Sequence, residues 1–210
     1  MKKIKMAMIV FFAAHVVLGQ YDPEAKAILD AMSARYRKIP AFTATFTQQL
    51  TNESAGLDEK ISGSIAVKGN KYKLNVAGQQ IFNDGTDIWA YNAEAREVTV
   101  SPYVVDDQEI SLSNIWDIYK EGFKYALLEN NDRGNRVIDL DPIDRSKSYF
   151  KIRMEISPAN ELRSFTVFEN TGTKYIYTIG AFKEVATLQD SDFTFNPQKY
   201  PGVEVIDFRE

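Results

Sequence analysis

Residues 61–100 alternate apolar and polar side chains with a period of two, and this pattern constrains the fold more than any other feature. Ile65 and Val67 alternate with polar neighbours, and Leu74 and Val76 continue the pattern beyond a turn. Successive side chains of a β-strand point to opposite faces, so this period predicts strands with one apolar and one polar face. We therefore expect an antiparallel sheet whose apolar face needs a cover.

Two polar dipeptides divide this stretch. Gly69-Asn70 and Asp84-Gly85 are typical of tight turns between strands. The stretch thus predicts three apolar strands joined by two short turns. The bulky strand-forming residues after the second turn are Ile88, Trp89 and Tyr91.

The first 20 residues have the composition of a secretory signal peptide. A basic start precedes an apolar run from Met6 to Leu18, and small Gly19 follows before Gln20. The run is too short for a membrane anchor and lacks a stop-transfer flank. No Cys follows it, so we expect no lipid anchor. We predict cleavage of residues 1–20 and export of residues 21–210 as one soluble domain.

Charge and residue inventory exclude several classes of function. Residues 21–210 carry 22 Lys and Arg against 29 Asp and Glu, a net charge of −7, so nucleic acid is a poor partner. The single histidine, His15, lies in the predicted signal peptide, and the chain has no Cys. Zinc sites built on His or Cys, Ser-His-Asp triads and Cys nucleophiles are therefore excluded. We expect no metal and no cofactor.

Two segments are predicted to form helices that cover the sheet. Asp22 and Pro23 are typical of a helix N-cap and first residue, and Pro40 ends this helix. Residues 111–120 follow a serine cap with apolar side chains at helical spacing and predict a second, short helix that docking must stabilise. The first helix has an apolar stripe of Ile28, Leu29, Met32, Tyr36 and Ile39, and the second one of Leu112, Ile115, Trp116 and Tyr119.

The remaining segments are typical of strands and turns, which makes about ten to eleven strands in an all-antiparallel domain. The further strands are expected at residues 42–50, 123–128, 136–140, 149–157, 162–169 and 174–182, with a tail from 193.

Three carboxylate pairs could suggest acid–base chemistry, but their positions favour solvated loops. Each pair lies in a link or at a turn, where Asp is common, and nothing indicates two carboxylates that face each other across a cleft. We therefore expect no enzyme. The pairs are Asp106/Asp107, Asp139/Asp141 and Asp190/Asp192.

The predicted sheet offers more apolar surface than two helical segments can cover. The 13 Phe, 11 Tyr and 2 Trp are compatible with an ordinary sheet core. Either the sheet closes on itself or it leaves an apolar cavity that takes a ligand. The residue pattern leaves both alternatives open.

Several short motifs follow one another in an order that resembles a known family. They are the strand motif Phe46-Thr47-Gln48, the run GSIAVK at 63–68, Asp84-Gly85 before Trp89 and Tyr91, the run FTFNP at 193–197, and Gly202-Val203. With the signal peptide and the first helix, their order and spacing resemble the periplasmic outer-membrane lipoprotein carrier (LolA) family over most of residues 21–210.

The resemblance implies an incomplete, unclosed antiparallel β-barrel with a helical lid over an apolar cavity. In that family the cavity receives the acyl chains of a lipoprotein released by an inner-membrane ABC-type transporter, and a receptor at the outer membrane accepts them. Each CH₂ exposed to water costs about 0.8 kcal/mol, so a carrier needs only to hide this surface, without chemistry. The resemblance thus implies a monomeric periplasmic carrier of acylated lipoproteins.

One departure concerns the lid. Better-known members carry Arg-Pro after the lysine that corresponds to Lys68, and that arginine is considered to latch the lid by hydrogen bonding. Gly69-Asn70 occupies the place here. The latch is therefore not expected in this chain, and lid opening is expected to be looser or to use another group.

We expect the acyl-chain cavity to be lined by apolar residues of the sheet and of the lid. A binder of free or glycosylated lipids on the same fold, and a structural β-domain with a filled core, remain alternatives. The candidate residues are Phe42, Phe46, Ile65, Val67, Tyr72, Leu74, Val76, Trp89 and Tyr91 on the sheet, and Ile28, Leu29, Met32, Ile115 and Trp116 on the lid.

Overall fold

The computed structural model describes residues 22–104, 110 and 112–209. Within these residues the chain forms one α-helix, α1 (Pro23–Arg37), and twelve strands. The first six strands are β1 (Ala41–Asn52), β2 (Leu57–Lys68), β3 (Lys71–Val76), β4 (Gln79–Asn83), β5 (Asp87–Asn92) and β6 (Glu97–Pro102). The other six are β7 (Phe123–Leu127), β8 (Arg136–Pro142), β9 (Tyr149–Ile156), β10 (Leu162–Glu169), β11 (Lys174–Glu184) and β12 (Glu204–Asp207).

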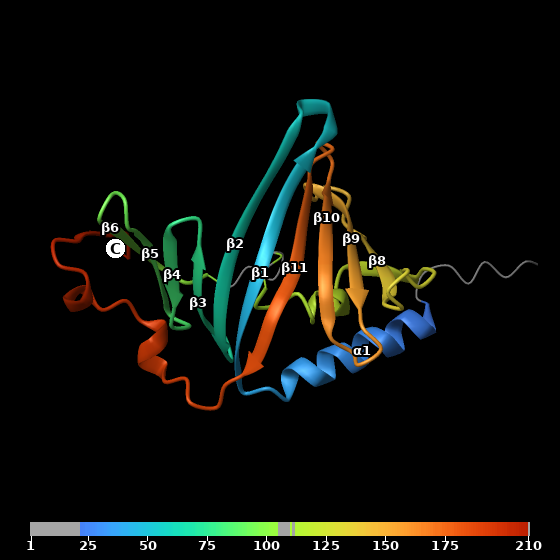
Figure 1. Cartoon of the computed structure of the whole chain (residues 1–210), viewed down its shortest axis with the longest axis horizontal. Helices are drawn as coiled ribbons and strands as arrows, with labels where there is room; N and C mark the ends of the chain where they lie inside the picture. The colour runs from blue at the N-terminus through green and yellow to red at the C-terminus, as the bar shows by residue number, and fades with distance from the viewer. Residues whose placement is uncertain (1–21, 105–109, 111, 210) are drawn as a thin grey trace, which may run out of the picture.

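All twelve strands belong to one sheet, in the order β12-β6-β5-β4-β3-β2-β1-β11-β10-β9-β8-β7. The edge strands β12 and β7 lie at opposite ends of this order, which confirms the predicted unclosed, mostly β architecture. Figure 1 shows α1 crossing one end of β10, β9 and β8. It also shows the C-terminal segment, residues 185–209, running from the end of β11 past β3 and β4 to β6. The strand count is slightly higher than expected.

Helix α1 begins as the sequence predicts. The Asp22 carboxylate accepts hydrogen bonds from the backbone N–H groups of Glu24 (2.9 Å) and Ala25 (3.2 Å). It also accepts one from Leu127 N (3.0 Å) in β7, and these bonds, led by that of Leu127, lower the pKa of Asp22. One N-cap residue therefore fixes both the start of α1 and its position against the edge strand.

The sheet has an inner face, which carries Ile65, Leu74 and Phe165, and an outer face, which carries Lys73 and Phe82. The largest part of the core lies on the inner face between α1 and β7–β11. The predicted helix stripe contributes to it, and Leu29 and Met32 are fully buried there. Burying a side chain of this kind contributes roughly 1.5–3 kcal/mol, so α1 is held mainly by its apolar face.

The stretch 61–100 forms five strands, where the sequence analysis expects three. Two more turns divide the stretch: residues 93–96 join β5 to β6, and the missed turn Ala77-Gly78, with φ of 50° and 78°, joins β3 to β4. Positive φ at both central residues suits a tight hairpin turn, but Ala rarely adopts it. The turn at Gly69, with φ of 59°, lies where it was predicted.

Three further expectations need correction. Asp139, expected with Asp141 in a solvated turn, is buried in β8 and forms ion pairs with Lys151 and Arg153 of β9. The sheet is not all antiparallel, because β12 runs parallel to β6, with Val205 opposite Val98. In the segment predicted as a short helix, residues 112–117 form turns and Ile118–Lys120 forms a 3₁₀ turn. A helix of this length is marginal alone, and docking of its side chains against α1 determines the observed conformation.

Across the described residues, no helix combines the length and the apolar character that crossing a bilayer requires.

Candidate functional site

An apolar hollow of about 220 Å³ lies between the inner face of the sheet and the insert, the name used here for residues 110 and 112–120. Strands β1 to β4 supply its floor, Tyr177 of β11 one side, and Ile110, Leu112 and Ser113 of the insert its cover. The sheet residues that line it are Phe46, Gln48, Ile65, Tyr72, Leu74, Val76, Ile81 and Tyr177.

Strand register explains why these side chains share one face. Ile65 of β2 is opposite Leu74 of β3, and Leu74 is opposite Ile81 of β4. Residues directly opposite each other in a sheet point to the same side. The period-two pattern in the sequence therefore produces a continuous apolar floor across three strands.

Gly63 determines how close Phe46 can come to this floor. A Cβ atom at Gly63 would lie 2.5 Å from Cζ of Phe46 and 2.7 Å from the carbonyl oxygen of Asn75. No side chain fits there, so the Phe46 ring packs directly over the backbone of β2. Glycine in a strand commonly marks such a close approach.

Next to the hollow, four aromatic rings and their neighbours surround a void of about 20 Å³, which we call the throat. Trp116 stacks on Tyr36, with centroids 4.9 Å apart and an interplanar angle of 11°, and meets Phe42 edge-on at 5.6 Å. Phe182 stacks on Phe42 at 4.8 Å. Ile65 and Leu112 line both the throat and the hollow, so the two spaces are adjacent.

Polar bonds fix the end of the insert to α1. The Asp117 carboxylate accepts hydrogen bonds from Oγ of Ser33 (2.6 Å) and Nε of Arg37 (3.1 Å), and from Nζ of Lys120. Burial by itself raises the pKa of Asp117, but these bonds outweigh it and lower the pKa below its usual value. The insert is thus anchored at Asp117, while residues 112–116 lie over the hollow and the throat.

A second bond strengthens this anchor. The Tyr119 hydroxyl donates to Oδ1 of Asp30 at 2.6 Å, and burial together with this bond raises the pKa of Tyr119.

The structure brings together most of the predicted cavity residues. Five of them line the hollow, and Ile65 also lines the throat together with Phe42, Ile115 and Trp116. Val67 packs in the same cluster as Phe42. Ile28, Leu29 and Met32 lie instead in the main core under α1. The five in the hollow are Phe46, Ile65, Tyr72, Leu74 and Val76.

The structure does not place Trp89 and Tyr91 with this group. Trp89 is opposite Phe82, and Phe82 is opposite Lys73, which faces away from the hollow. Trp89 and Tyr91 therefore lie on the outer face, and Tyr91 packs there against Phe195 and Tyr200 of the C-terminal segment. A period of two puts both residues on one face, but the register across the missed turn decides which face.

Several lining residues have no signal that distinguishes them in the sequence. Ile81 follows the missed turn, and Ile179 and Phe182 come from β11, which pairs with β1 across a long sequence separation. Gln48 is the exception, because it belongs to the strand motif Phe46-Thr47-Gln48. Its Nε2 donates to the Tyr177 hydroxyl at 2.7 Å and ties β1 to β11 within the hollow.

At the position of the missing latch, the β2–β3 turn is held by a different interaction. Lys68 and Lys71, on either side of Gly69-Asn70, contact the two carboxylate oxygens of Asp190 at 2.9 and 2.8 Å. The hydrogen bonds from Lys71 and Lys68 lower the pKa of Asp190 to about 2. This clasp, Lys68–Asp190–Lys71, fastens the C-terminal segment to the sheet.

Among the described residues, no three His, Cys, Asp or Glu side chains are grouped as a metal site would require. The site is an apolar hollow covered by an anchored segment, on the inner face of an unclosed curved sheet. This geometry is typical of a binding site for apolar ligands.

Comparison with known proteins gives the family. Residues 37–196 match the model of the family described as outer membrane lipoprotein carrier protein LolA. The chain belongs to this family.

Individual relatives are distant in sequence. The chain is 24% identical over 201 residues to the outer-membrane lipoprotein carrier protein of Yersinia pestis bv. Antiqua (strain Angola), covering 88% of this chain and 92% of that one. Its fold is similar to an uncharacterized conserved protein from Thermus thermophilus, with a TM-score of 0.58, 14% identity and coverage of 88% and 99%. It is also similar to the lipoprotein LppX of Mycobacterium tuberculosis, with a TM-score of 0.50, 12% identity and coverage of 80% and 100%.

Proposed function

We propose that this protein carries acylated lipoproteins through the periplasm and shields their acyl chains in the hollow. It would take them from an inner-membrane ABC-type transporter and deliver them to the outer membrane, where an acceptor takes them over. The observation that carries the proposal is the apolar hollow under the insert, lined by Phe46, Ile65 and Leu74. Family membership supports a carrier of lipoproteins or lipids.

The site suits the physical task of a carrier, which is to keep acyl chains out of water. Each acyl CH₂ removed from water contributes about 0.8 kcal/mol, so an unescorted lipoprotein with several chains faces a barrier of tens of kcal/mol. Apolar walls alone can lower this barrier, and no covalent step is needed. We therefore propose a carrier and not an enzyme.

The size of the hollow implies movement. At about 220 Å³ it is smaller than the roughly 300–1,000 Å³ usual for ligand pockets. We propose that residues 112–116 lift from the sheet, and that the bonds of Asp117 to α1 resist this movement. Lifting would separate Trp116 from Phe42 and join the hollow to the throat.

Export is part of the same proposal. The signal peptide expected at residues 1–20 lies outside the described residues. We propose that it is removed and that residues 21–210 act in the periplasm as one domain.

The proposal is tested by producing the full-length chain together with a periplasmic lipoprotein. We expect the acylated lipoprotein to be recovered from the soluble periplasmic fraction in a complex with this protein. The control is the same lipoprotein with its acylated cysteine changed to serine, which should not co-purify. If the acylated form stays entirely in the membrane fraction, the carrier proposal fails. Recovery of a lipid without any peptide would favour a binder of free lipids.

A further inference from the structure

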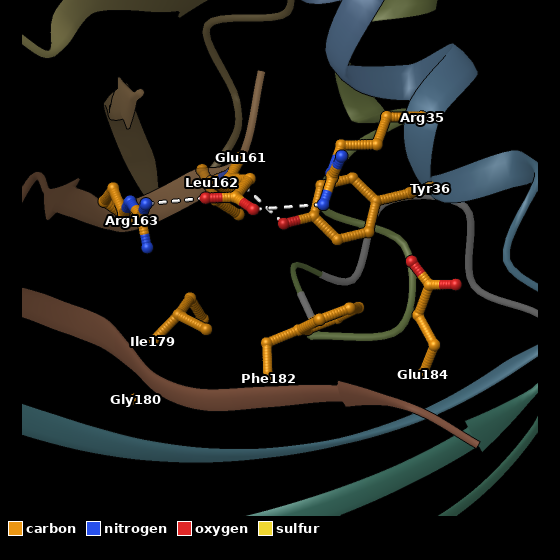
Figure 2. Close-up of a pocket in the computed structure, with 9 residues that line it drawn as sticks. All are labelled: Arg35, Tyr36, Glu161, Leu162, Arg163, Ile179, Gly180, Phe182 and Glu184. Atoms are coloured by element: carbon orange, nitrogen blue, oxygen red, sulfur yellow. Dashed lines mark hydrogen bonds and ion pairs between the residues drawn. The ribbon is translucent and has the colours of Figure 1, made fainter. Parts of the chain in front are cut away.

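A second opening lies between β10 and β11, where the two strands diverge. Their antiparallel pairing ends at Ser164 and Thr178, yet β11 continues beside β1 as far as Glu184. The space between the diverging strands and the end of α1 is a pocket of about 250 Å³, which we call the slot (Figure 2). The sheet wall is therefore interrupted at this point.

The outer part of the slot is charged. Glu161 accepts hydrogen bonds from Nη2 of Arg35 (3.0 Å) and Nη2 of Arg163 (2.6 Å). Glu184 lines the same space from the end of β11, as Figure 2 shows. Two guanidinium groups and two carboxylates make the formal charge of the slot zero.

The inner part of the slot is apolar and meets the throat. Tyr36, Leu162, Ile179 and Phe182 line both spaces. Tyr36 and Phe182 meet edge to face, with centroids 5.6 Å apart, and the Tyr36 hydroxyl accepts a hydrogen bond from Leu162 N at 3.1 Å. Since the throat also adjoins the hollow, the three spaces lie in series through the protein.

The slot is the most polar of the three spaces. The outer end has the ion pairs of Arg35 and Arg163 with Glu161, the throat has aromatic rings, and the hollow has aliphatic and aromatic walls. In the hollow, Gln48 already donates to the Tyr177 hydroxyl. A long-chain lipid with its polar end in the hollow would bury that end against walls that are mostly aliphatic and aromatic, which costs free energy. The reverse orientation buries only the chain.

We propose, on the basis of the carrier function above, that the slot binds the polar end of one acyl chain of the cargo. That end is an ester or amide linkage, and the chain runs through the throat into the hollow. Arg35 and Arg163 supply N–H donors for the carbonyl oxygen of the linkage. Glu161 and Glu184 balance their charge, so the slot suits a neutral acceptor better than a free carboxylate. Tyr36 and Trp116 separate to admit the chain.

The test blocks the slot in the folded protein by labelling a cysteine that is introduced at its edge. The chain has no cysteine, so Glu184→Cys introduces a single thiol at the slot, and biotin-maleimide attached to it fills the opening. The matched control is Lys183→Cys, also exposed but on the opposite face of β11, where Lys183 lies opposite Thr43. The probe is monopalmitoylglycerol, with Kd measured by tryptophan fluorescence titration.

We expect labelled Glu184→Cys to bind the probe at least about tenfold more weakly than the unlabelled variant, as displacement of two methylenes at roughly 0.8 kcal/mol each implies. Labelled Lys183→Cys should bind like the wild type. An unchanged Kd for labelled Glu184→Cys would overturn the slot proposal while the carrier function stands. If the wild type binds neither the probe nor an acylated lipoprotein, the carrier function fails and the slot proposal fails with it.

Discussion

Trp116 of the insert lies flat against Tyr36 of α1, with ring centroids 4.9 Å apart and an interplanar angle of 11°. The stack joins the two elements that cover the inner face of the sheet. Tyr36 also accepts a hydrogen bond from Leu162 N, so one tyrosine connects the insert, α1 and β10. Any movement of the insert that admits a ligand must separate this pair or rotate both rings together.

The anchor of the insert predicts the behaviour of Asp117→Asn. The substitution keeps the shape of the side chain but removes the ion pairs with Arg37 and Lys120. Hydrogen bonds to charged groups contribute roughly 1.5–3 kcal/mol when buried, and this side chain is part-exposed, so we expect a loss of about 1 kcal/mol in the free energy of unfolding. Urea denaturation measures this loss. The matched control is Asp132→Asn in an exposed turn, which should change nothing measurable.

Loss of the Asp117 bonds to α1 should also change the rate of ligand uptake. If residues 112–116 form the moving cover, Asp117→Asn should take up a fluorescent fatty acid faster than the wild type in stopped-flow mixing. An uptake rate equal to that of the wild type, with the stability loss present, would contradict the moving cover.

Because β3 has two different faces, neighbouring substitutions on it should differ in their effect on ligand binding. Leu74 lines the hollow, whereas Lys73 lies on the outer face over the Phe82 ring at 4.7 Å. Leu74→Gln puts an amide against apolar walls, which costs about 1–3 kcal/mol if the amide finds no partner. We therefore expect acyl-chain binding to weaken about tenfold or more in Leu74→Gln, and Lys73→Gln to bind like the wild type. Calorimetric titration with a fatty acid measures both, and equal affinities in the two variants would exclude the hollow as the binding site.

The clasp, Lys68–Asp190–Lys71, predicts a pH dependence. The folded protein lowers the pKa of Asp190 from 3.8 to about 2, mainly through hydrogen bonds from Lys71 and then Lys68. A lowered pKa means that the stabilisation is fully present above pH 3.8 and is lost as the pH falls toward about 2. Because Asp190 is exposed, the effect is small and should weaken further at high salt.

Comparison with Asp190→Asn isolates this effect from the titration of other carboxylates. The wild type should have the higher melting temperature at neutral pH, and the difference between the two should shrink between pH 4 and pH 2. A difference that stays constant over this range would show that the clasp does not contribute.

Local patterns predicted the elements whose partners lie close in the sequence. Asp22 and Pro23 defined the start of α1, and the alternation through Ile65 and Leu74 defined strands whose apolar side chains do share one face. Both depend on chain geometry within a few residues, where periodicity and capping are informative.

Features that depend on strand register, or on contacts between residues far apart in the sequence, could not be predicted from local patterns. Ala77-Gly78 lacks the usual turn residues, so β4 was missed and the face of Trp89 was assigned without knowing the register. The insert adopts turns because Asp117 and Tyr119 bond to α1, about 85 residues earlier in the chain. No local signal encodes that contact.

The most direct test of the central claim uses the two tryptophans of the chain. Trp116 borders the throat beside the hollow, whereas Trp89 lies on the outer face. Trp89→Phe leaves only Trp116, and Trp116→Phe leaves only Trp89. Each variant is titrated with a fatty acid brominated along its chain, because bromine quenches a tryptophan that it contacts. We predict strong quenching of Trp116 and little of Trp89. Equal quenching of both, or quenching of Trp89 alone, would contradict an acyl-chain site between the insert and the inner face of the sheet.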